Sequence, residues 1–161
     1  NLAEKFSKDI GTTAELRATY KSADVRTATD TAASKKAYYD TFSKALATAK
    51  KNDMGNEIVV IADYFSSEES DAAALTKLSN TYATLTKSLK SMNAPSSAAA
   101  LHLELLNESD NMAAIFKNIA QIDDDSIIGL VAIAQFEINE PKMEKTLADF
   151  LAYFKSNAIF N

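Results

Sequence analysis

The stretch LTKLSNTYATLTKSLKSM, residues 75–92, carries a large apolar side chain at every third or fourth position. This spacing brings the apolar side chains onto one face of an α-helix. The stretch therefore predicts an amphipathic helix that buries this face against other helices. The face is formed by Leu75, Leu78, Tyr82, Leu85, Leu89 and Met92.

The length and composition fit one globular domain. A chain of 161 residues buries roughly 70% of the surface that its unfolded form exposes. Hydrophobic residues make up 47% and charged residues 24%, which favours neither a disordered nor a membrane class. We therefore expect a single helical-bundle domain over residues 1–161. Because the chain starts at Asn1 rather than at a methionine, we interpret it as an excised or processed piece of a longer precursor.

The charge disfavours two classes of partner. The net charge is −5 and the basic residues are dispersed, so the surface on average repels nucleic acid and anionic lipid. The longest apolar stretch, from Ile127 to Ile138, is well short of the roughly 20 residues that a membrane-spanning helix needs. We expect no nucleic-acid partner and no direct membrane insertion by this segment.

A long helix is predicted near the N-terminus. From about Thr13 to Asp53 no glycine or proline interrupts the chain, which allows a helix of roughly 40 residues, about 60 Å long. Residues 21–37 contain few large side chains apart from Val25, so this part either packs closely against the bundle or projects from it.

The remaining apolar patterns predict the other helices. Residues 58–65 are apolar around most of the helical circumference and predict a buried helix, with a β-strand as the alternative. In the last helix, Pro141 predicts a kink or a restart. We expect an all-α antiparallel bundle of five or six helices joined by short turns. The further apolar faces comprise Leu2, Phe6 and Ile10; Leu101, Leu105, Met112, Ile115, Phe116 and Ile119; and Ile127, Val131, Ala134 and Ile138, continued by Leu147, Phe150, Leu151 and Phe154.

Residues suited to catalysis are scarce. The chain has one histidine, no cysteine and three glycines, too few for phosphate-binding loops or nucleophile elbows. His102 is a candidate ligand contact, although a hydrogen-bonded structural histidine is the simpler interpretation. Asp123–Asp125 lack the glycine and glutamate that a calcium loop needs, and they are typical of a helix N-terminus. We predict no catalytic, metal or cofactor site.

Tyr38 and Tyr39 are candidate partner contacts. Adjacent residues on a helix point about 100° apart, so a bundle can hardly bury both side chains completely. The exposed one is then available to a protein partner or to a second copy.

The segment APSSAAALHLELLN, residues 94–107, is followed by an apolar helix and by a close of the form Tyr153-Phe154 to Ile159-Phe160. Residues 94–161 thereby resemble a C-terminal helical region of uncharacterised exported proteins from ultra-small candidate-phyla bacteria. The resemblance implies an extracytoplasmic or cell-envelope setting, in which His102 belongs to the start of a helix. It transfers no activity, substrate or cofactor.

Together these features predict a non-enzymatic helical module that acts through its surface. We expect an interaction, scaffold or assembly role with a protein partner or with further copies of the chain. The alternative is a bundle that holds a small apolar ligand, a tetrapyrrole or a metal, with His102 as the contact.

Overall fold

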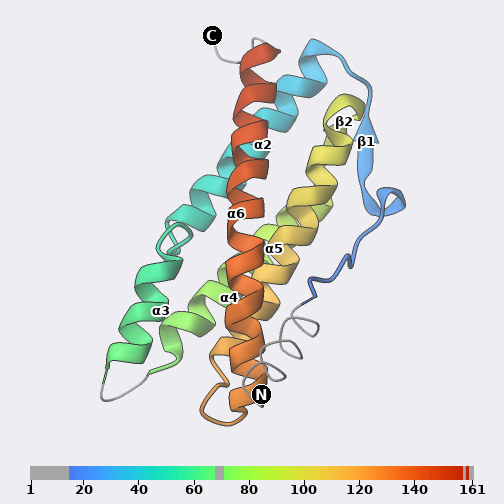
Figure 1. The fold of residues 1–161 in the computed structure, drawn as a ribbon. Coiled ribbons are helices and arrows are strands. Elements are labelled where there is room, and N and C mark those ends of the chain that lie inside the picture. The colour runs from blue at the N-terminus through green and yellow to red at the C-terminus, as the bar shows by residue number, and fades with distance from the viewer. Residues whose placement is uncertain (1–14, 68–70, 158, 160–161) are drawn as a thin grey trace.

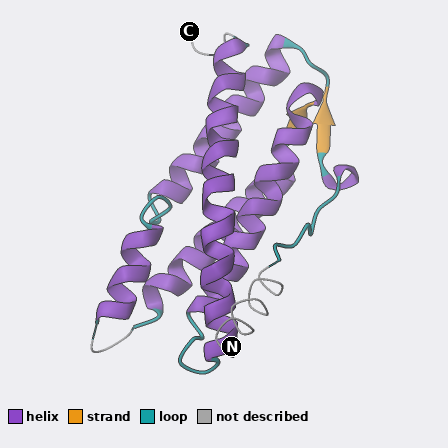
Figure 2. Ribbon diagram, viewed as in Figure 1, coloured by secondary structure: helices purple, strands orange, loops and turns teal. Residues whose placement is uncertain are grey.

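A computed structural model describes residues 15–67, 71–157 and 159. Within these residues it contains five α-helices, two short 3₁₀ helices and two three-residue strands, and the helices pack against one another (Figures 1 and 2). The predicted all-α class is therefore confirmed. In chain order the elements are η1 (Ser22–Asp24), β1 (Arg26–Ala28), α2 (Ala32–Lys50), α3 (Glu57–Ser66), α4 (Ala73–Ser91), β2 (Asn93–Pro95), η2 (Ser96–Ala98), α5 (Ala99–Ile119) and α6 (Ser126–Ser156).

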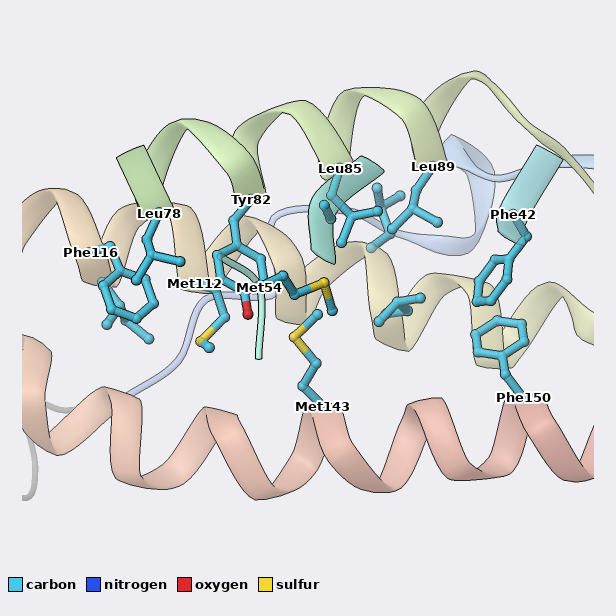
Figure 3. Close-up of a cluster of buried hydrophobic side chains, with 14 of the residues drawn as sticks. Phe42, Met54, Leu78, Tyr82, Leu85, Leu89, Met112, Phe116, Met143 and Phe150 are labelled. Carbon is cyan, nitrogen blue, oxygen red and sulfur yellow. The ribbon is translucent and has the colours of Figure 1, made fainter. Parts of the chain in front are cut away.

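The core lies around α5, which packs against both α4 and α6. All six side chains of the predicted α4 face are buried, and so are most of those predicted for α5. Figure 3 shows Leu78, Tyr82, Leu85 and Leu89 pointing from α4 toward α5 and α6. The three-four spacing therefore identified the central face of the bundle.

An aromatic cluster joins α2 to the C-terminal half of α6. The ring of Phe42 lies 4.5 Å from that of Phe150 and 5.4 Å from that of Phe154, measured between ring centroids. Tyr38 packs beside the same rings. Large aromatic side chains thus attach α2 to the bundle where its other residues are mostly small.

The helix predicted over Thr13 to Asp53 is wrong for its first part. Of the residues described, 15–31 contain no α-helix, and α2 begins only at Ala32. Thr31 caps it: its hydroxyl accepts a hydrogen bond from the backbone N–H of Ser34, and the Ser34 side chain accepts one from the N–H of Thr31. This reciprocal cap gives the helix a defined start, and the Thr, Ser and Asp residues upstream have low helix propensity.

Residues 15–31, which we call the N-terminal strap, lie along α5 instead. The side-chain amide of Asn107 accepts from the N–H of Tyr20 at 2.8 Å and donates to its carbonyl at 3.1 Å. Asn111, one turn further on, does the same for Arg17 at 3.0 and 2.9 Å. Two asparagines thus pair the backbone groups of Arg17 and Tyr20, which a helix would otherwise have paired.

The C-terminal end of the N-terminal strap is bound beside the start of α5. Strands β1 and β2 pair in parallel, with Arg26 opposite Asn93 and Ala28 opposite Pro95. The carboxylate of Asp30 accepts hydrogen bonds from the hydroxyls of Ser96 and Ser97 and from the N–H of Ser97. These bonds lower the pKa of Asp30, because they favour its ionised form. After the 3₁₀ turn of η1, the part of residues 21–37 from Arg26 to Asp30 therefore packs against the body in extended form.

Helix α6 runs without interruption through Pro141, so of the two outcomes predicted for this proline, a kink or a restart, the restart is wrong. The Asp125 side chain caps the helix by accepting from the N–H groups of Ile127 and Ile128, as expected of the acidic turn. Gly129 packs closely against Ile122, because a Cβ added there would lie 2.3 Å from a side-chain atom of Ile122. The helix predicted around Leu2, Phe6 and Ile10 lies outside the described residues.

Candidate functional site

His102 is buried between three helices. On α5, its ring lies within hydrogen-bonding distance of the Tyr38 hydroxyl on α2, at 2.8 Å from Nδ1, and of the Leu89 carbonyl on α4, at 3.0 Å from Nε2. Because a carbonyl only accepts, Nε2 carries the proton and Nδ1 accepts from Tyr38. Burial lowers the pKa of His102, which favours this neutral ring.

This geometry gives His102 a structural role. Both ring nitrogens are engaged, so a metal or a haem would have to displace a buried hydrogen bond to reach either of them. The ring lines neither of the two hollows described below. It joins α2, α4 and α5 at one point.

The two predicted contact tyrosines have different surroundings. Tyr38 is buried, whereas Tyr39 is half-buried and its ring packs edge-on against Phe154 at 5.0 Å. These positions agree with the expectation that the bundle does not completely bury both tyrosine side chains. Tyr38 is therefore not available to a partner, and any such role passes to Tyr39.

The N-terminal half of α6 presents a different face from the one predicted. Its buried residues are Gly129, Ala132, Phe136 and Asn139. The predicted face points outward, with Ile127 at 61% exposure and Ile138 at 41%. The neighbouring Leu130 is 42% exposed. We call this surface the outer stripe of α6; it comprises Ile127, Leu130, Val131, Ala134 and Ile138.

Helix α3 is a helix, as predicted, but it is not buried. Ile58, Val59 and Phe65 are exposed, and its buried residues are Glu57 and Tyr64. The Tyr64 hydroxyl donates a hydrogen bond to Asp123 at 2.9 Å, so the face of α3 that carries Tyr64 is the one that contacts the bundle. Helix α3 thus exposes a second set of apolar side chains.

The hollows between the helices include a groove and a smaller cavity. A groove of about 1070 Å³ separates α2 from α4, and small or polar side chains such as Ala45, Thr48 and Thr84 line most of it. A smaller cavity of about 320 Å³ lies where the start of α3 meets α5 and α6. Its lining includes Met54 and Met143, and we call it the methionine cavity.

Ionisable groups elsewhere make no metal site in the described ranges. No group of three or more His, Cys, Asp or Glu side chains among them is placed to hold a metal ion. Glu108 receives a hydrogen bond from Thr146 at 3.0 Å, while its Oε2 is buried without a partner, and burial raises its pKa. Asn139 Oδ1, on the facing helix, is likewise buried without a partner.

The sequence interpretation missed several of these residues. Asn107 and Asn111 stand four residues apart inside a helix, where asparagine is unfavourable, and that spacing was the available signal. Glu57 gave no signal, because an acidic residue in the first turn of a helix is ordinary.

Comparison with known proteins does not extend these observations: no family model matches the chain, and neither a curated protein nor a solved structure matches it. In the part of the chain that the structure describes, no helix is both long enough and apolar enough to cross a membrane.

Proposed function

We propose that this chain is a non-enzymatic helical module that self-associates through the outer stripe of α6. The observation that carries the proposal is a row of apolar side chains along one helix, exposed at Ile127, Leu130 and Ile138 and partly exposed at Val131 and Ala134 between them. Ile127 and Ile138 mark its ends, about 16 Å apart at 1.5 Å per residue. Apolar patches of this kind mark interaction sites more often than chance.

The arrangement of side chains suits a two-fold contact between two α6 helices. The large residues Ile127 and Ile138 lie at the ends of the stripe, and the small Ala134 lies near its middle. In an antiparallel pair, Ile127 of one copy would meet Ile138 of the other, and Ala134 would allow the helices to approach closely. A two-fold contact of this type is self-complementary, as closed dimers require.

The charges flanking the stripe agree with the same arrangement. Lys142 lies four residues after Ile138, and the acidic turn Asp123–Asp125 lies just before Ile127. With Ile127 opposite Ile138, the acidic turn of one copy lies near Lys142 of the other. Unlike charges therefore meet at both ends of the contact.

We also infer that α4 and α5 run antiparallel to each other within one copy. His102 on α5 bonds to Leu89 near the end of α4, whereas Ala113, later on α5, accepts from Ser79, earlier on α4. The order of these contacts supports opposite directions.

We propose an extracytoplasmic, cell-envelope setting for the module. It rests on the resemblance of residues 94–161 to exported proteins. The non-enzymatic part of the proposal is supported by the structural use of His102, whose two ring nitrogens hold neighbouring helices.

Sedimentation equilibrium over a concentration series tests self-association. The wild type should show a concentration-dependent mass, and Ile127→Glu/Ile138→Glu should be monomeric, because each substitution adds a charge to an exposed position of the stripe. The matched control is Ile58→Glu/Phe65→Glu, which removes two exposed apolar side chains from α3 and adds the same charge. The control should associate as the wild type does.

Two results would overturn the proposal. A wild type that is monomeric at every concentration would exclude self-association. A loss of association in the α3 control but not in the α6 variant would place the contact on α3 instead. Lys142→Glu gives an independent check, since it should weaken association and reverse the effect of added salt.

A further inference from the structure

The lining of the methionine cavity includes three of the chain's four methionines, beside the apolar side chains of Ile58, Val59 and Leu147. Met54, Met112 and Met143 come from the turn after α2, from α5 and from α6, and all three line the cavity. Figure 3 shows their side chains converging with that of Tyr82. Methionine is flexible and polarisable, so such walls adapt to ligands of different shape.

A buried carboxylate also lines this cavity. Glu57 is 9% exposed, and its Oε1 accepts hydrogen bonds from the Tyr82 hydroxyl and from the N–H of Gly55, the latter at 2.7 Å. Its Oε2 accepts no hydrogen bond from the residues that the structure describes. None of the ion pairs found among those residues includes Glu57. This carboxylate therefore has one oxygen that accepts no hydrogen bond, and it makes no ion pair with another described residue.

Two further carboxylates belong to the same lining. Glu140 and Glu144 lie one turn apart on α6. Partial burial, the neighbouring charges of Glu144 and Glu57 and a side-chain hydrogen bond with Glu144 raise the pKa of Glu140. Lys50 is the one basic residue in the lining, so the carboxylates outnumber it three to one.

We infer that the methionine cavity binds a small organic cation with a hydrocarbon body, such as a primary alkylammonium ion. The hydrocarbon would pack against Met54, Met112 and Met143, and the ammonium group would lie beside the carboxylates of Glu57 and Glu140. Apolar walls with a few placed polar groups are the usual composition of small-ligand sites, and a volume of about 320 Å³ is at the small end of their range. This inference does not depend on self-association.

Methyl NMR of protein labelled with ¹³C at the methionine methyl groups tests it, with hexylammonium as the probe. Titration should shift the signals of Met54, Met112 and Met143. Met92 is the internal control, because it is as buried as Met54, at 8% exposure each, but lines the other groove. Each signal is assigned from a single Met→Leu variant.

The charge requirement is tested by comparing hexylammonium with hexanol and hexanoate. Hexylammonium should bind most tightly and hexanoate should not bind. Glu140→Gln should weaken hexylammonium binding about threefold to fivefold and leave hexanol binding unchanged, since Glu140 is partly exposed to solvent. The matched control is Glu137→Gln, which removes an exposed carboxylate from the same helix outside the cavity lining.

Three outcomes would overturn the inference. They are equal shifts at Met92 and at the cavity methionines, equal affinity for hexanol and hexylammonium, or no shift at any methionine. Each leaves the self-association proposal intact, because sedimentation is measured without the probe.

Discussion

Removing the Tyr38 hydroxyl tests the role assigned to His102. In Tyr38→Phe the buried Nδ1 of His102 loses its donor at 2.8 Å, while the ring keeps its packing against Phe42 and Phe150. A buried acceptor left without a partner costs about 1–3 kcal/mol. Because the shape of the core hardly changes, we expect the free energy of unfolding to fall by that amount.

Urea unfolding followed by circular dichroism measures the loss, and the melting temperature should fall by about 3–9 °C for a chain of this size. A double-mutant cycle with His102→Leu supplies the control. If the two side chains form one unit, the coupling energy between the two substitutions should be about 0.5–3 kcal/mol. A loss below about 0.5 kcal/mol in Tyr38→Phe, or additive effects in the cycle, would refute the hydrogen bond as a determinant of stability.

Four other variants or conditions follow from single contacts. Because the pKa of His102 is lowered in the folded state, the unfolded chain takes up a proton first as the pH falls. The free energy of unfolding should therefore fall below pH 6.5, by up to about 1.4 kcal/mol per pH unit. His102→Leu should abolish this slope in urea titrations. The raised pKa of Glu108 has the opposite effect, because its contribution to the free energy of unfolding is lost as pH rises through the folded-state pKa. Glu108→Gln should therefore be more stable than the wild type at pH 7, by under about 1 kcal/mol after allowing for partial exposure. At pH 4 it should not be more stable. Gly129→Ala should lower stability by about 1–3 kcal/mol in thermal melts, because its Cβ would overlap Ile122, and Ile122→Ala should restore part of that loss. Asn111→Ala should speed amide hydrogen exchange in the N-terminal strap about fivefold to tenfold, and unchanged exchange there would show that the amide does not hold the strap.

The parts of the fold that the sequence predicted well are those with one unambiguous apolar face. On α4 every large apolar residue lies on the same side of the helix, so the periodicity indicates a single face that can be buried. The acidic turn Asp123–Asp125 likewise predicted the start of α6, because Asp125 has a local hydrogen-bonding role that depends on no distant residue.

The N-terminal strap could not be predicted in the same way, because its structure depends on distant partners. Residues 15–31 contain no glycine or proline, so local rules allowed a helix. The extended form is held by Asn107, Asn111 and Ser97, which lie between 67 and 94 residues away in the chain. Such long-range bonds decide between two conformations that the local sequence leaves close in energy.

In the candidate sites, too, the sequence predicted the features that depend on local residues and missed those that depend on distant ones. The interpretation of His102 as a structural histidine agrees with its position, but its partners Tyr38 and Leu89 lie on two other helices and could not be read from its neighbours in the chain. The methionine cavity joins Met54, Met112 and Met143 across three separate segments. No spacing rule connects residues so far apart, and only the packing of the helices brings them together.

Helix α6 shows why hydrophobicity alone chose the wrong face. Ile127, Val131, Ala134 and Ile138 are more apolar than the residues that are buried, but their row runs on to Pro141 and Lys145. The row through Ala132, Phe136 and Asn139 continues in phase to Met143, Phe150 and Phe154, which meet α2 and α5 along the rest of the helix. Because α6 is one continuous helix, its two halves turn together about the helix axis, and the longer row of large side chains determines which face is buried. The shorter row is then left exposed, and it forms the outer stripe that we propose as the contact between two copies.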